Sequence, residues 1–176
     1  MASKLLELMR AEFPKEVLDT RSRLGNETVV LTRDRIVEIV GFLKSDSRTQ
    51  MNFLRDITAV DYLQRKPRFE VVYVFYSMEL KHMLVVRVPL QGNDISIPSI
   101  HEHYGCAGWL EREVYDMYGM DFTGHPDLRR VLLYDEFEGH PLRKDYAVQR
   151  SQPRVALRKR CLARRSPSIN RPLAGA

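Results

Sequence analysis

The stretch WLEREVYDMYGMDFTGHPDLRRVLLYDEFEGHPLRKDY, residues 109–146, holds the densest polar content of the chain. It begins with the spacing of an amphipathic helix, which is expected to end at Gly119. Four residues predict the apolar stripe of this helix: Leu110, Val114, Met117 and Tyr118. Three polar residues are expected to turn away from the stripe: Glu111, Arg112 and Asp116.

Two Gly-His-Pro turns follow the predicted helix, at residues 124–126 and 139–141. Because proline fixes φ and glycine adopts conformations closed to other residues, each turn is expected to have one shape. Charged residues cluster soon after each turn: Asp127, Arg129 and Arg130 after the first, and Arg143, Lys144 and Asp145 after the second. Arginine is well suited to bidentate pairing with carboxylates at interfaces. The stretch therefore predicts a rigid, charged docking surface.

Three blocks in this stretch resemble the signature of a known family. They are ERE followed by YDMYG within residues 111–119, HPDLRR at residues 125–130, and EGHPLRKDY at residues 138–146. In this order they closely resemble the 30 kDa subunit family of respiratory complex I, whose bacterial members form the C subunit of NADH-quinone oxidoreductase. The resemblance continues more weakly upstream to roughly residue 50.

The resemblance implies a function carried by contact. The chain would be a non-catalytic structural and assembly subunit in the peripheral arm of a proton-translocating NADH-quinone oxidoreductase, at the cytoplasmic face of the bacterial inner membrane. It would pack against the quinone-site subunit of the 49 kDa type and the iron-sulfur subunits, which would bind the clusters, FMN and quinone. The signature residues expected at the partner interface are Glu111, Arg112, Glu113, Asp116, His125, Asp127, Arg129, Arg130, Glu138, His140, Arg143, Lys144 and Asp145.

Several kinds of site find no support in the residues. The two cysteines, Cys106 and Cys161, form no Cys-x-x-Cys pair and fall short of the four thiolates that an iron-sulfur cluster normally needs. There is no Gly-x-Gly-x-x-Gly or phosphate-binding loop, so no nucleotide or flavin site is expected. The longest apolar run, residues 71–76, is far shorter than the roughly 20 residues of a membrane span, and the first residues lack the apolar core of a signal peptide. Membrane association is therefore expected only through the complex.

One cluster has the spacing of metal ligands, His101-x-His103-x-x-Cys106. Without a second cluster, a turn before the helix is the favoured interpretation. The two histidines of the Gly-His-Pro turns, His125 and His140, are expected to hold their turns by hydrogen bonds rather than to act as catalytic bases.

The acidic residues of the helix are expected to make structural ion pairs rather than to carry out acid-base chemistry. Arg112 and Asp116 are spaced i, i+4 and predict an ion pair along the helix surface. Glu113 adjoins the apolar stripe and is expected to be partly buried, with a cationic partner from Arg129, Arg130 or Arg143.

The upstream sequence predicts an α+β domain with a small N-terminal α/β layer. A helix is expected over residues 3–13, with Ser3 as its N-cap and Pro14 closing it, followed by a polar turn over residues 21–26. A strand is expected over residues 28–31. Thr32 is then expected to cap a helix over residues 33–44, whose apolar stripe is Ile36, Val37, Val40 and Leu43.

A central, mostly antiparallel sheet is predicted next along the chain. Residues 53–61 are expected to form a strand, and residues 69–76 and 82–88 are expected to form an antiparallel hairpin. The strand over residues 69–76 is apolar on both faces, so both faces are expected to be partly covered. The segment from residue 109 onward is then an extended motif region packed on this sheet.

The chain divides at residue 146 into a single predicted domain and a basic tail. Residues 147–176 contain eight of the 28 basic residues and no acidic residue, which leaves 20 basic against 23 acidic residues in 1–146. Prolines interrupt the tail, which is expected to be extended or disordered. Members of the resembled family commonly have proline after the final Asp-Tyr and then an acidic extension, whereas this chain has Ala147 and a basic one.

Two alternative functions stay open on the sequence alone. The basic tail allows a nucleic-acid-binding protein, although it contains no Phe, Tyr or Trp to stack on bases. Similar subunits also occur in membrane-bound [NiFe] hydrogenases and in ferredoxin- or F420-dependent complexes, which the motifs alone do not separate from complex I.

Overall fold

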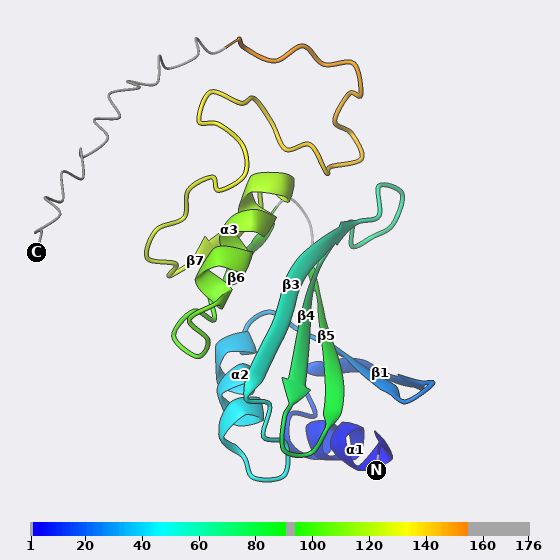
Figure 1. Ribbon diagram of the computed structural model, residues 1–176. Coiled ribbons are helices and arrows are strands. Elements are labelled where there is room, and N and C mark those ends of the chain that lie inside the picture. Colours follow the sequence, from blue (N-terminus) through cyan, green and yellow to red (C-terminus); the bar gives the residue numbers. More distant parts are fainter. Residues whose placement is uncertain (1, 91–93, 155–176) are drawn as a thin grey trace, which may run out of the picture.

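The computed structural model describes residues 2–90 and 94–154, except the side chains of residues 2 and 3. Three helices and seven strands occur in the described ranges, in the order α1 (Ala2–Glu12), β1 (Val17–Arg23), β2 (Asn26–Leu31), α2 (Ile36–Ser45), β3 (Phe53–Asp61), β4 (Phe69–Ser77), β5 (His82–Leu90), β6 (Ser96–Pro98), α3 (Ala107–Tyr118) and β7 (Asp121–Thr123). Figure 1 shows α3 beside the sheet and the chain after it passing over the same end of the molecule.

The central sheet has five strands in the order β1-β2-β5-β4-β3. Its strand pairs are antiparallel except β2 and β5, which run parallel with Glu27 to Val30 beside Leu84 to Arg87. A second, two-stranded sheet joins β6 and β7 in parallel. The predicted α+β class, with a mostly antiparallel central sheet, is confirmed.

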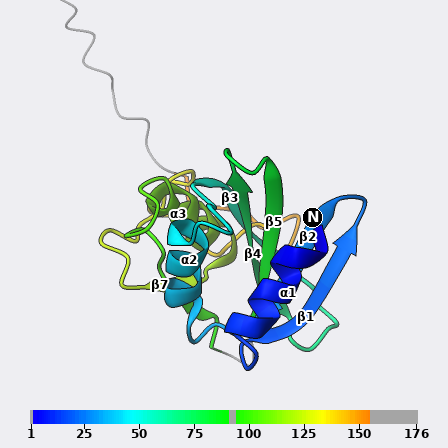
Figure 2. The same cartoon turned by 90° about the horizontal axis from the view of Figure 1, so that it is seen from below.

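One apolar core joins the sheet to all three helices. Alternate residues of the central strands, among them Val71, Tyr73 and Val86, are fully buried in the same cluster as Met9 of α1 and Val114 of α3. Figure 2 shows α2 and α3 together beside the sheet, with α1 next to β1 and β2. The helices therefore cover one face of the sheet, and the core lies between them and that face.

The N-terminal layer differs from the prediction at a turn. The predicted helix over residues 3–13 is present as α1, but the prediction that Ser3 is its N-cap is wrong, because α1 already begins at Ala2. The predicted polar turn over residues 21–26 is wrong in extent, because β1 runs on to Arg23 and β2 begins at Asn26. Only Leu24 and Gly25, with φ of 52° and 81°, make the turn. The polar residues of β1 are compatible with a strand because β1 lies at the edge of the sheet.

The second helix begins later than the sequence predicts. Thr32 is not its cap, because α2 starts at Ile36, with Arg35 at the N-cap position and no side-chain cap bond. The backbone N–H of Thr32 instead donates to the carbonyl of Glu16, which prolongs the strand pairing. The apolar stripe is also rotated from the prediction, since Ile39 is buried and Val37 is only partly buried.

Candidate partner interface

Helix α3 carries two fully buried carboxylates, Glu111 and Asp116. The prediction that both turn away from the core side is wrong. Glu111 lies at i+4 from Ala107 and faces the same core, and polar partners from distant parts of the chain surround both acids. Glu113, predicted to be partly buried, is exposed instead.

Glu111 holds the turn that precedes its own helix. Its carboxylate accepts the Ser99 hydroxyl at 2.5 Å and the backbone N–H of Ile100 at 2.8 Å. Burial raises the pKa of Glu111, and these two hydrogen bonds offset part of that increase. The Glu111 side chain is therefore buried inside the domain and is not exposed for contact with a partner.

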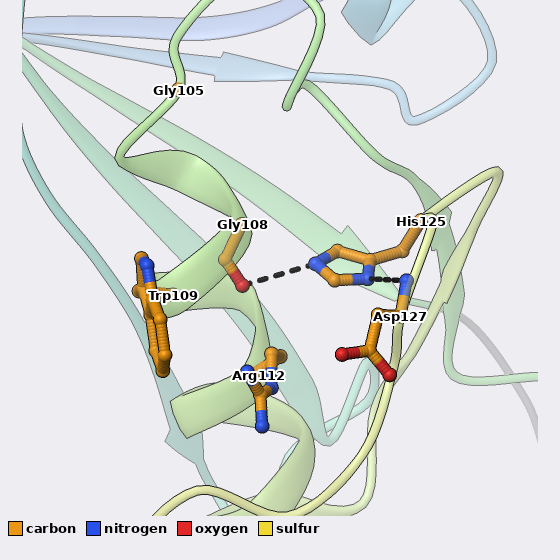
Figure 3. Close-up of a pocket in the computed structure, with 6 residues that line it drawn as sticks. All are labelled: Gly105, Gly108, Trp109, Arg112, His125 and Asp127. Atoms are coloured by element: carbon orange, nitrogen blue, oxygen red, sulfur yellow. Dashed lines mark hydrogen bonds between the residues drawn. The ribbon is translucent and has the colours of Figure 1, made fainter.

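His125 fastens the first Gly-His-Pro turn to the start of α3. Its Nε2–H donates to the carbonyl oxygen of Gly108 at 3.0 Å, and its Nδ1 accepts the backbone N–H of Asp127 at 3.0 Å (Figure 3). This pattern requires the neutral tautomer with its proton on Nε2. The prediction that His125 holds its turn by hydrogen bonds is confirmed.

A shallow pocket of about 210 Å³ opens beside this turn (Figure 3). Trp109 and Arg112 project from α3 at its margin, with the guanidinium carbon 4.8 Å from the centre of the indole. Trp109 is 63% exposed, so an aromatic ring braced by an arginine stands at the surface. Side chains of this kind dominate the binding energy of many protein interfaces.

The histidines of the predicted metal-like cluster face different elements. His101 contacts the Ser99 hydroxyl through Nδ1 at 3.1 Å, whereas the ring of His103 lies against Gly41 of α2. In residues 2–90 and 94–154, no group of three or more potential ligands is placed to hold a metal ion.

Asp116 positions the loop that follows the first turn. Its Oδ2 accepts three successive backbone N–H groups, from Val131, Leu132 and Leu133, at 2.9 to 3.1 Å. Its Oδ1 accepts Arg130 at 2.7 Å. Burial acts to raise the pKa of Asp116, but the hydrogen bonds from these residues outweigh burial and lower it.

Two arginines of the signature also serve this loop. Arg130 extends from Asp116 to the carbonyls of Phe137 and Gly139, at 3.0 and 3.1 Å. The predicted Arg112–Asp116 pair is wrong, because Arg112 donates to the carbonyls of Arg129 and Arg130 and Asp116 is occupied by the loop. The partner of Asp116 thus lies 14 residues along the chain instead of one helical turn away.

The second Gly-His-Pro turn caps the C-terminal end of α3. The Nδ1–H of His140 donates to the carbonyl oxygen of Asp116 at 3.0 Å. The backbone N–H of Leu142 donates to the carbonyl oxygen of Met117 at 3.1 Å. Arg143 donates to the carbonyls of Tyr118 and Gly119, at 2.5 and 3.4 Å. The last carbonyls of a helix have no partners within the helix, and here residues 140–143 supply them. The prediction that His140 holds its turn by a hydrogen bond is confirmed.

Lys144 and Asp145 connect this loop to the two ends of the β3–β4 link. The backbone N–H of Lys144 donates to Asp61 at 2.8 Å, and Asp145 pairs with Arg68 at 3.0 Å. Arg68 also binds Asp61 through two bonds of 2.8 Å, which lowers the pKa of Asp61. The Lys144 side chain is exposed.

The remaining predicted residues lie at the surface. Arg129 pairs with Asp127 at 2.9 Å, and their side chains are 72% and 55% exposed. Glu138 pairs with Arg150, and Gln152 bonds the backbone of Glu138, so residues from the start of the predicted tail contact the loop. The division of the chain at residue 146 stays a prediction.

Exposed apolar side chains form a further part of this region that the sequence did not predict. They are Trp109, Leu132, Tyr134, Leu142 and Val148, between 39% and 99% exposed. All belong to α3 or to the loops after it, which lie at the end of the molecule away from α1 (Figure 1). The sequence feature that could have indicated this surface is the presence of large apolar residues in a region without helix or strand periodicity.

These contacts define an α+β domain with a preformed loop surface, partly apolar and partly charged, that is suited to contact with another protein. Residues 29–152 match the family described as respiratory-chain NADH dehydrogenase, 30 kDa subunit. The chain belongs to this family, and the resemblance stated from its motifs is confirmed.

Two relatives illustrate the match. The C subunit of NADH-quinone oxidoreductase from Geobacter sulfurreducens is 44% identical over 142 residues, which cover 80% of this chain and 86% of the relative. The protein of the same name from Dinoroseobacter shibae is 49% identical over 133 residues, 76% of this chain and 61% of the relative.

Two solved structures share the fold. A trypsin-resistant fragment (1–134) of Nqo5 is 36% identical, with a TM-score of 0.61 over 72% of this chain and 98% of the fragment. A chain of the membrane-bound sulfane sulfur reductase, an archaeal respiratory membrane complex, has a TM-score of 0.71 at 21% identity, over 84% of this chain and 86% of that one. The second likeness is one of fold alone. None of the helices described in this chain is long and apolar enough to span a membrane.

Proposed function

We propose that this chain is a structural subunit of the peripheral arm of a proton-translocating NADH-quinone oxidoreductase and has no active site of its own. The observation that carries the proposal is the match, over 80% of this chain and 86% of the relative, to a protein named as the C subunit of that enzyme. In this role the chain supports electron transfer from NADH to quinone by holding other subunits in place. Iron-sulfur clusters, FMN and quinone would bind to those subunits.

The geometry supports contact as the function. Three polar side chains of the signature are buried: Glu111, Asp116 and His125. They form hydrogen bonds with the chain's own backbone, so they hold the loops in place. The exposed groups of the same loops, such as Leu132 at 62% and Arg129, then face outward for a partner. An apolar centre with charged residues at its rim is the usual anatomy of a protein interface.

For the partner we propose the quinone-site subunit of the 49 kDa type together with the neighbouring iron-sulfur subunits. The location is the cytoplasmic face of the bacterial inner membrane, with attachment through the complex. Because a preformed surface loses little conformational entropy on binding, a loop held as firmly as residues 130–143 is suited to stable association.

A pair of leucine variants tests the proposal. Leu132→Asp places a charge in the proposed interface, and Leu24→Asp places the same charge on the β1–β2 turn, where Leu24 is 92% exposed. Leu132→Asp should leave the isolated chain folded and reduce assembled complex on a native gel by about tenfold or more, since a buried leucine contributes about 2 kcal/mol. Leu24→Asp should assemble normally.

Normal complex levels and normal quinone reductase activity with Leu132→Asp would contradict the proposed surface. Affinity purification of the tagged full chain identifies the machine itself. Subunits of a nicotinamide-flavin module should copurify; recovery of hydrogenase subunits instead would leave the family assignment intact and overturn the proposed enzyme.

A further inference from the structure

The face of the central sheet opposite the helices is apolar. Residues paired across neighbouring strands lie on the same face, so the register assigns its members. One row contains Thr28, Val85 and Val74, which pair in turn across β2, β5 and β4. The next row contains Val30, Arg87 and Val72. At the end near the β4–β5 turn, Met83 pairs with Tyr76 and Tyr76 pairs with Phe53.

No described element covers these valines. Val30, Val72, Val74 and Val85 are neither in the buried core cluster nor among the apolar residues packed against it, and each is part-exposed. Their neighbours along the same strands, such as Val71, are fully buried. The strands therefore present valine to both sides, and only one side has a layer of helices.

Such strands are characteristic of sheets covered on both faces. The strands of all-parallel sheets, which have helices on both faces, read as near-continuous apolar runs. The run VVYVFY in β4 has that character. Antiparallel strands with one solvated face would alternate apolar and polar residues instead.

Charged residues lie mainly at the margins of this face. Asp19 and Arg21 pair with each other on β1, and Asp56 lies on β3 at the opposite edge. In the middle, Arg87 is neutralised by Glu70 at 2.6 Å. The centre thus needs an uncharged apolar partner, and the rim, which has both signs, needs charges of both signs.

We propose that this valine face binds an amphipathic helix of a neighbouring subunit, which supplies the missing layer of helix on the sheet. The proposal rests on the proposed function, since it places the helix in the same complex. The chain's own residues 155–176 are a poorer match, because they carry six basic residues and no acidic one. The charges that the register places on the face are balanced, with three acidic residues (Asp19, Asp56 and Glu70) and three basic ones (Arg21, Arg23 and Arg87).

The position of the face favours the same complex. The link between β3 and β4 lies at one end of the face, where the Tyr62 hydroxyl accepts Arg87 at 2.8 Å. The same link is joined to the signature loops through Arg68 and Asp145. A neighbour that contacts residues 144–145 therefore lies close to the valine face.

Photocrosslinking in the assembled complex tests the proposal. Benzoylphenylalanine is placed at Val74 in the full chain, the complex is purified and irradiated, and crosslinked peptides are identified by mass spectrometry. We expect a crosslink to another subunit, at a segment whose apolar residues recur at i, i+3, i+4 and i+7. A crosslink to a second copy of this chain, or to a segment with strand alternation, overturns the proposal.

The same probe at Leu132 separates the two proposals. If position 132 crosslinks to another subunit and position 74 does not crosslink, the valine face is unoccupied and only the present inference fails. If the tagged chain enters no complex at all, the proposed function fails with it.

A variant pair adds a quantitative measurement. Val74→Lys and Val85→Lys should each reduce incorporation into the complex by about tenfold. Each variant removes a valine that the bound helix would bury and places a charge in the contact. Leu24→Lys, on the exposed β1–β2 turn, should incorporate normally. Thermal unfolding of each isolated variant is the control for folding, and unchanged incorporation of both valine variants overturns the proposal.

Discussion

The sheet region, residues 17–90, and the loop region, residues 121–154, are held in place by different forces. Buried apolar side chains on every strand of the central sheet except β1 join one core cluster. Among residues 121–154, Phe122 is the only apolar residue that is buried. That region is positioned by hydrogen bonds to α3 instead. Apolar burial spreads stability over many residues, whereas polar anchoring concentrates it in a few atoms, so single substitutions should have unequal effects in the two regions.

The largest effect is expected at Asp116. Asp116→Ala removes the acceptor for three backbone N–H groups and leaves Arg130 without its buried partner. Breaking a buried pair of this kind costs about 3–5 kcal/mol of folding free energy. The loop should also become mobile, so that trypsin cleaves the chain after Arg130. Urea unfolding and limited proteolysis measure both changes. Asp135→Ala, at an exposed acid of the same loop, is the matched control; equal behaviour of the two variants would show that the loop does not depend on α3.

A smaller effect is expected at the helix end. Gly119 has φ of 70°, and an added Cβ would lie 2.4 Å from His140 Nε2 and 2.8 Å from Arg143. Gly119→Ala should therefore cost roughly 1–2 kcal/mol of backbone strain and also displace the residues that cap α3. Gly105→Ala, where a Cβ meets open space, is the control and should change the melting temperature little. Equal melting temperatures for the two variants would contradict the capping role.

In the sheet region, the ionisation of Glu27 is expected to change stability within a limited pH window. Burial raises the pKa of Glu27 from 4.5 to about 7. The folded state therefore binds a proton that the unfolded state releases, so stability should fall as the pH rises from 4.5 to about 7 and level off above it. Glu27→Gln should reduce this decline in urea unfolding measured across the window, and the contribution of Glu111, whose pKa is also raised by burial, should remain. Glu113→Gln, an exposed residue of equal charge, should retain it.

The smallest effect is expected from truncation after Tyr146. Residues 147–154 contact the loop through exposed groups, such as the pair of Arg150 with Glu138, whose side chains are 43% and 62% exposed. Exposed pairs of this kind contribute about 1 kcal/mol or less. The melting temperature of residues 1–146 should thus be close to that of residues 1–154. A drop as large as that of Asp116→Ala would mean that the segment stabilises the whole domain.

The parts of the fold that follow periodicity were predictable. The strand over residues 69–76 and the hairpin with residues 82–88 show their apolar pattern directly, and the structure has them as β4 and β5. The strands β6 and β7 were missed because each has three residues, too few for any pattern to appear. Their pairing is decided by the return of the chain after α3.

The candidate site was predictable in its location and less so in its contacts. The Gly-His-Pro turns correctly indicated that His125 and His140 hold the loops. Helical spacing alone assigned Asp116 to Arg112, whereas its partners come from residues 130–133. A local sequence pattern identifies only partners that are close in sequence. A buried carboxylate accepts hydrogen bonds from the donors that lie near it in the folded protein, and these are often distant in sequence.

The cap on α3 also makes the loop surface dependent on the helix. The carbonyls that hold residues 140–143 are oriented toward that loop only after the last turn of α3 has formed. The loop surface therefore exists only on a chain whose helix is complete, and a partly folded chain offers a partner no such surface.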